Sequence, residues 1–153
     1  MARQTPAGRV PIRRRLQLLR NWELFNVTFF LVLLAWWIQA TAPSTWFVTS
    51  FSVGLVCYLL LQGGVYWHIK GQSVAHGAAR MPEYFCTLFT VLRRSSVVLL
   101  IGFPVIASIA WTLSLTTVRE IAWSSALTGF AALEYVNYYH YQLMHDTEND
   151  VRF

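Results

Sequence analysis

Apolar residues gather in four long runs that are separated by short polar or basic segments. The runs cover about 22–40, 46–67, 95–117 and 121–143. Because an α-helix rises about 1.5 Å per residue, about 20 mainly apolar residues cross the roughly 30 Å hydrocarbon core of a bilayer. All four runs approach or reach that length. The pattern therefore predicts an all-α fold, an integral membrane four-helix bundle that forms a single domain over 1–153.

Two of the three connections between these runs are very short, at 41–45 and 118–120. Helices joined by so few residues pack as antiparallel neighbours. We therefore expect the first and second spans to form one helical hairpin, and the third and fourth spans to form another.

Basic residues alternate from one side of the predicted bundle to the other. The residues before the first run and between the second and third runs are Arg3, Arg9, Arg13, Arg14, Arg15, Arg20, Lys70, Arg80, Arg93 and Arg94. The two short connections contain only Arg119. Because Lys and Arg concentrate in cytoplasmic loops, this alternation predicts that both termini are cytoplasmic. It also accounts for the net charge of +5 without nucleic acid as a partner.

Two segments outside the apolar runs have helical periodicity. In the basic amphipathic segment 9–21, Ile12, Leu16 and Leu19 share one face and Arg13 to Arg15 lie on the other, which suits anionic headgroups or a simple topology anchor. Together with Ala40-Thr41-Ala42, this segment also fits a cleavable secretory signal, whose removal would leave three spans in the same orientation.

The second such segment lies in the predicted cytoplasmic loop 68–94. Aromatic and leucine residues recur at helical spacing over 82–92, and Pro82 suits the start of a helix. Two readings fit this pattern, a helix along the membrane surface or an inward extension of the third span.

The composition agrees with a membrane protein. Hydrophobic residues make up 56% of the chain and charged residues 12%, whereas soluble domains carry about a quarter charged residues. Seven Trp and seven Tyr fit the aromatic belts at bilayer interfaces. Cys57 and Cys86 have no metal-ligand spacing, and we expect both to be free thiols.

The fourth run differs from the others because polar and aromatic residues replace aliphatic ones over 133–143. Glu134 is placed about 13 Å from the end of the span, near the bilayer centre. An ionised carboxylate there costs at least about 2.5 kcal/mol, so Glu134 must be protonated, solvated or paired. Arg93 or Arg94 could neutralise it if 82–92 extends the third span.

Several residues share one helical face with Glu134. Successive residues of an α-helix are rotated by 100°, and on this projection five polar or aromatic residues fall within an arc about 100° wide. This polar stripe consists of Glu134, Asn137, Tyr138, Tyr141 and His145. His140 lies about 60° outside the arc, and Gln62 is a candidate partner on the second span. We expect the polar stripe to face the interior, either as a network that sets helix register or as a ligand pocket.

No metal site and no cofactor are predicted. A carboxylate-bridged metal site needs paired Glu-x-x-His motifs, and Glu134-x-x-Asn137 departs from that pattern. Haem held by His68 with His140 or His145 is an alternative, although no haem motif accompanies these residues.

The segment Glu134-Tyr135-x-Asn137-Tyr138-Tyr139-His140-x-Gln142-Leu143 and the polar tail after it resemble the ending of some uncharacterised small bacterial four-span membrane proteins. The resemblance covers about the last 20 residues and implies no activity. It implies a multi-pass protein of the bacterial cytoplasmic (inner) membrane.

Two functional hypotheses follow. The first is a non-catalytic accessory, assembly or stress-related subunit that meets a membrane protein partner or a second copy of itself. The second is a membrane enzyme or proton-linked carrier that handles a lipid or small amphiphile in a polar pocket around Glu134.

Overall fold

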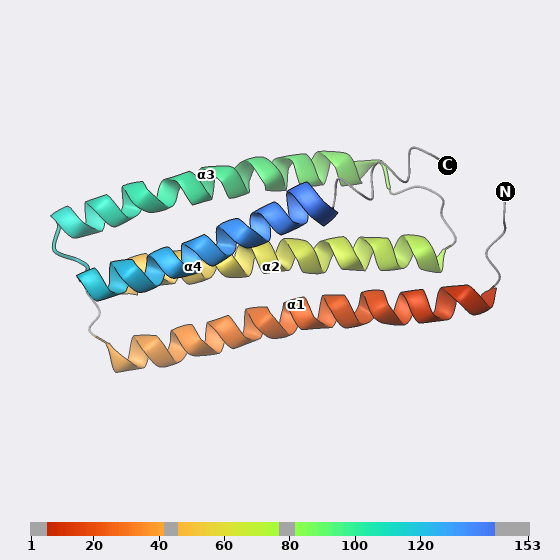
Figure 1. Cartoon of the computed structure of the whole chain (residues 1–153), viewed down its shortest axis with the longest axis horizontal. Coiled ribbons are helices and arrows are strands. Elements are labelled where there is room, and N and C mark those ends of the chain that lie inside the picture. Colours follow the sequence, from red (N-terminus) through yellow and green to blue (C-terminus); the bar gives the residue numbers. More distant parts are fainter. Residues whose placement is uncertain (1–5, 42–45, 77–81, 143–153) are drawn as a thin grey trace.

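All regular structure in the described part of the chain is helical. This computed structural model describes residues 6–41, 46–76 and 82–142. Its elements are α1 Pro6–Ala40, α2 Trp46–Ala75, α3 Tyr84–Thr112 and α4 Val118–Val136, which continues as a π-helix, η2, over Asn137–Gln142 (Figure 1). The predicted all-α class is therefore confirmed.

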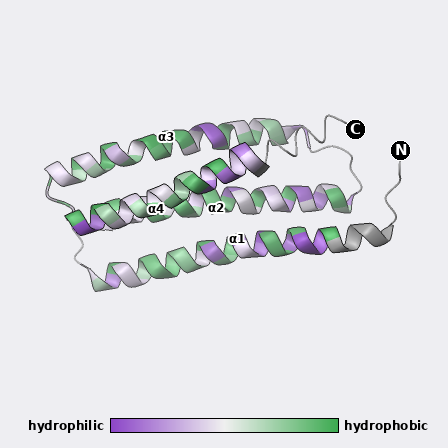
Figure 2. Ribbon diagram, in the orientation of Figure 1, coloured by the Kyte–Doolittle hydropathy of each residue, from purple (hydrophilic) through white to green (hydrophobic). Residues whose placement is uncertain are grey.

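Three of these helices are long and apolar enough to cross a membrane, over Ile12–Ala40, Trp46–Ala75 and Tyr84–Thr112. They support a multi-pass membrane protein. Figure 2 shows their hydrophobic lengths in green, with purple gathering toward the N-terminal part of α1. The α-helical part of α4 has 19 residues and carries Arg119, Glu120 and Glu134, and it falls outside this set.

The centre of the molecule is α2. In its most apolar stretch 67% of the residues are buried, against 6% in α1 and 11% in α3. The reason is that α2 packs against all three other helices, whereas α1 and α3 lie on opposite sides of the α2 and α4 pair (Figure 1). The expected first hairpin is present along its whole length. The expected second hairpin, of α3 and α4, is only loosely packed, because α4 packs mainly against α2 and only weakly against α3.

Apolar side chains from α2 form the main core. Val56, Leu59 and Leu60 are almost fully buried and contact Val27 of α1 and Ala131 of α4. Hydroxyl groups join the same helices: Thr128 donates to Ser52 at 3.2 Å, and Thr49 and Ser124 share a hydrogen bond at 3.3 Å. Short side chains at these positions allow the helix backbones to approach closely.

Two helices extend beyond the predicted spans. The amphipathic segment 9–21 continues without a break into the first span as part of α1. The helix α3 begins at Tyr84, so most of the segment 82–92 extends the third span at its N-terminal end and is not a separate surface helix. Its Phe85 and Phe89 pack against Tyr66 of α2, which explains why the extension stays with the bundle.

The turn between α3 and α4 is held by a capping box. The Glu120 carboxylate accepts a hydrogen bond from the Thr117 backbone N–H at 2.9 Å, and the Thr117 hydroxyl accepts one from the Glu120 N–H at 3.4 Å. Glu120 is 3% exposed and also accepts from the Thr116 hydroxyl. Such a box satisfies two N–H groups that the first turn of a helix otherwise leaves unpaired.

Candidate functional site

A tyrosine of η2 reaches across the bundle to α1. The Tyr138 hydroxyl donates to the Glu23 carboxylate at 2.5 Å. Its ring lies over Gly63 of α2, where a Cβ atom would overlap the Tyr138 phenol. Gly63 therefore creates the space through which Tyr138 connects α4 with α1.

The neighbouring tyrosine makes a second set of contacts. The Tyr139 hydroxyl donates to Gln62 Oε1 at 2.5 Å, and Gln62 Nε2 donates to the Ser96 hydroxyl at 3.0 Å. Tyr139, Gln62 and Ser96 are all buried. The three side chains come from η2, α2 and α3, so one buried amide holds three helices in register.

The structure divides the polar stripe that the sequence predicts. Tyr138 is buried and Glu134 is partly buried, but Asn137 and Tyr141 are exposed, as is His140. The reason is the π-helix, because its i→i+5 hydrogen bonds place more residues in each turn than the α-helix from which the stripe was drawn. Two successive tyrosines, 138 and 139, can then both point inward. His145 lies outside the described residues.

Glu134 lies near a second carboxylate. Glu134 lies near Glu23, and of these two carboxylates it is Glu23 that accepts the hydrogen bond of Tyr138. The extension of α3 brings Arg93 alongside, but its Nε donates to the Tyr135 hydroxyl at 3.4 Å rather than to Glu134. This end of the bundle thus holds two neighbouring carboxylates, one of which is bound by Tyr138.

The histidines that were considered for haem have other contacts. His68 Nδ1 lies 3.3 Å from Arg20 Nη1, and its Nε2 lies 3.1 Å from the Gln72 amide nitrogen. The His140 ring packs edge-on against Tyr135. Within residues 6–41, 46–76 and 82–142 no group of three or more His, Cys, Asp or Glu side chains could hold a metal ion. Cys57 and Cys86 are free thiols, as expected.

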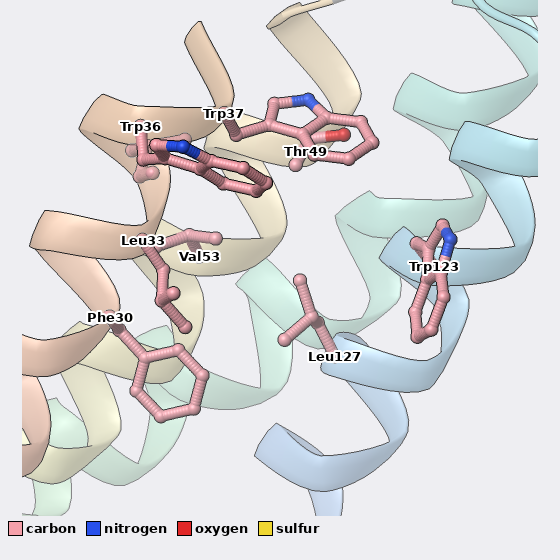
Figure 3. Close-up of a pocket in the computed structure, with 9 residues that line it drawn as sticks. Phe30, Leu33, Trp36, Trp37, Thr49, Val53, Trp123 and Leu127 are labelled. Carbon is pink, nitrogen blue, oxygen red and sulfur yellow. The ribbon is translucent and has the colours of Figure 1, made fainter. Parts of the chain in front are cut away.

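A groove opens between α1 and α4, where sequence patterns predict no site. Its volume is about 370 Å³, and nearly all of its lining is apolar, from Phe30, Leu33, Leu34, Trp36, Trp37, Thr49, Val53, Trp123 and Leu127 (Figure 3). Two tryptophans of α1 and one of α4 stand on opposite walls, and Leu33 and Leu127 project between them. The sequence of α1 does not predict this groove, because the groove depends on how far α4 lies from α1.

One polar atom in the groove lacks a partner. Trp37 Nε1 is buried and makes no hydrogen bond within the described residues. The Arg119 guanidinium lies 5.9 Å from the centre of the Trp37 ring, a cation–π distance. This contact involves the ring face and gives the indole N–H no acceptor. A buried donor without an acceptor costs about 1–3 kcal/mol. Because this N–H is enclosed by protein, it adds no polar contact to the open face of the groove.

Comparisons of this chain with protein-family models, with curated proteins and with solved structures find no match.

Proposed function

We propose that this chain is a non-catalytic accessory, assembly or stress-related subunit that holds a transmembrane helix of a partner protein in the groove between α1 and α4. The observation that carries the proposal is the groove itself, an apolar hollow with three tryptophans on its walls. Its occupant is an apolar helix whose side chains cover these tryptophans.

A partner helix fits the arrangement of the bundle. The helix α1 has its neighbours mainly on the α2 side, and large apolar side chains such as Val32 and Trp36 are 62% and 66% exposed. A helix laid between α1 and α4 would cover both walls at once. The inner polar groups, by contrast, bond to one another across the bundle, which suits a framework better than a reaction site.

The proposal includes four spans and two cytoplasmic termini. Support for α4 as the fourth span is its packing beside α2 over most of its length, since α2 is itself a candidate span (Figure 1). Support for the orientation is the concentration of arginines before the first span and their near absence from the connections 41–45 and 118–120. The resemblance of the C-terminal segment favours a bacterial inner membrane.

The proposal is tested by filling the groove. Leu33 projects into it and is 42% exposed, so Leu33→Trp occupies the groove without displacing core side chains. The matched control is Leu31→Trp, which lies on α1 at 50% exposure and does not line the groove. We expect a stoichiometric partner to co-purify with the native chain and with Leu31→Trp, and to be lost from Leu33→Trp.

A photo-crosslinking residue at position 33 identifies the occupant. The expected adduct joins this position to a membrane-spanning peptide of another protein. An adduct with lipid alone would contradict the partner-helix proposal, and an adduct with a second copy of the chain would replace it with a homo-oligomer.

A second candidate function rests on the pair of carboxylates. Tyr138 donates to Glu23, and Glu134 lies near Glu23, so two carboxylates stand together within the bundle, as a proton-linked carrier or membrane enzyme requires. Glu134→Gln separates the two candidates, because no hydrogen bond of Glu134 contributes to the network described above. An accessory subunit keeps its fold and partner in this variant, whereas a carrier or enzyme keeps its fold and loses its activity.

A further inference from the structure

A polar cavity lies between α1 and α2, at the opposite end of this hairpin from the connection 41–45. Its volume is about 280 Å³, and its lining residues are Arg13, Gln17, Arg20, His68, Gly71, Gln72, Ala75 and His76. Two arginines, two histidines and two amides therefore meet in one cavity. None of the eight residues is acidic.

Arg20 is the best-defined donor in this cavity. Its Nη1 donates to His68 Nδ1 at 3.3 Å and its Nη2 donates to Asn21 Oδ1 at 3.2 Å. Its Nε is buried and has no hydrogen-bond partner within the described residues. Arg20 is half-buried, with its Nε shielded and its two terminal nitrogens toward the open side. A second arginine nearby and the lack of any acidic lining residue favour an anion beside it.

The neighbouring contacts keep the cavity suited to an anion. Because arginine can only donate, His68 Nδ1 accepts the bond from Arg20 and the neutral ring carries its proton on Nε2. The Gln72 amide nitrogen lies 3.1 Å from His68 Nε2 on the other side of the ring. His76 Nδ1 donates to the Gln72 backbone oxygen at 2.8 Å. These bonds hold both imidazoles at the cavity without a carboxylate.

We propose that this cavity binds a phosphate group carried by an anionic phospholipid. Guanidinium forks match the oxygens of phosphate, and Arg13 and Arg20 stand two turns apart on α1 with the cavity beside them. The source is a lipid headgroup because the cavity lies at the start of the apolar span. Trp22, 57% exposed and suited to the interface, lies two residues after Arg20, and Phe25, 59% exposed, lies three residues further along α1 toward the membrane core.

This site is independent of the partner groove, which lies toward the other end of the α1 and α2 hairpin. The partner-helix proposal and the phospholipid proposal can be tested separately, because no residue lines both the groove and this cavity. A phospholipid held here would fasten α1 to α2 at their inner ends.

Gly71 allows a test that leaves every charge in place. A Cβ atom at this position would meet Leu16 Cβ at 4.0 Å, an ordinary contact, so Gly71→Ala is tolerated. A leucine side chain extends further and fills the cavity. Gly71→Leu is thus the blocking variant and Gly71→Ala its matched control.

The measurement is binding of phosphatidylglycerol to the full chain in a neutral detergent, followed by native mass spectrometry, with phosphatidylcholine as the neutral comparison. We expect Arg20→Gln and Gly71→Leu to weaken phosphatidylglycerol binding by roughly tenfold or more, since each removes a charge-assisted contact or its space. Gly71→Ala and Arg94→Gln, which changes an exposed arginine outside the cavity, should bind like the native chain.

Two outcomes overturn the proposal. Equal losses in Arg20→Gln and Arg94→Gln would mean that net charge, and not this cavity, attracts the lipid. Displacement of the lipid by millimolar inorganic phosphate, with phosphate itself bound in a one-to-one ratio, would keep the anion site but overturn its assignment to a lipid. Circular dichroism of each variant confirms that the helices remain folded.

Discussion

At the scale of single residues, Gly63 and Tyr138 depend on each other. The missing side chain of Gly63 makes room for the phenol that reaches Glu23. We predict that Gly63→Ala lowers the free energy of unfolding by about 1–3 kcal/mol, because Tyr138 must move and its hydrogen bond to Glu23 is lost. Unfolding by SDS in mixed micelles, followed by circular dichroism, measures the change.

Gly54 on the same helix provides the control for this prediction. A Cβ atom there would meet no heavy atom within 4 Å, so Gly54→Ala should be neutral or stabilise α2 by up to about 1 kcal/mol. Equal losses at positions 63 and 54 would show that the glycines act through helix flexibility and not through the space for Tyr138.

The sequence identifies part of the polar network. Glu134, Tyr138 and Gln62 stand out as polar groups in apolar runs, and the structure places Gln62 and Tyr138 in buried hydrogen bonds. Tyr139 was missed because an α-helical projection turns it away from Tyr138. The π-helix changes that projection, and no periodicity in a short aromatic run reveals it.

At the scale of elements, the start of α4 rests on the capping box of Thr117 and Glu120. We predict that Thr117→Ala costs about 1 kcal/mol, because the Glu120 N–H in the first turn loses its side-chain acceptor. Faster amide hydrogen exchange at Glu120, together with a lower free energy of unfolding, is the expected result.

Thr112 is the matched control for the cap. Its hydroxyl donates to the Ile109 carbonyl within α3 and takes no part in starting a helix. Thr112→Ala should change the free energy of unfolding by less than about 0.5 kcal/mol. A loss as large as that of Thr117→Ala would assign the effect to the removal of a threonine side chain in general and not to the cap.

Helix positions follow well from the apolar runs, and helix ends follow poorly. The cores of α1, α2 and α3 lie where hydropathy predicts them, but α1 begins earlier than the predicted span, and α2 continues to Ala75. Hydropathy marks only the part of a helix that suits lipid. The extension of α3 from Tyr84 depends on contacts between Phe85, Phe89 and Tyr66, which are far apart in the sequence.

At the scale of the whole molecule, the number of helices could be predicted but their order around α2 could not. Short connections identify which helices are antiparallel neighbours, and they say nothing of the face that each neighbour occupies. The separation of α1 from α4, and with it the groove, follows from α4 packing on α2 through Ser52, Ser124 and Thr128. That choice depends on side-chain fit across helices distant in the chain.

The proposed orientation can be tested with a natural cysteine. Cys86 is exposed in the first turn of α3, on the side that the basic residues assign to the cytoplasm. We predict that a membrane-impermeant maleimide labels Leu115→Cys, in the turn after α3, from outside intact cells. It should label Cys86 only after the membrane is permeabilised, and the reverse pattern would invert the topology.

The central position of α2 has a consequence for synthesis on the ribosome. Ser52, Gln62 and Gly63 lie in the second helix to emerge, whereas their partners Thr128, Tyr139 and Tyr138 belong to the last helical segment. Ser96 of α3 already bonds to Gln62, but Ser52 and the space over Gly63 gain their partners only when the later segment packs against α2. A nascent chain that stalls before residue 118 therefore leaves a Ser52 hydroxyl and the gap at Gly63 uncovered.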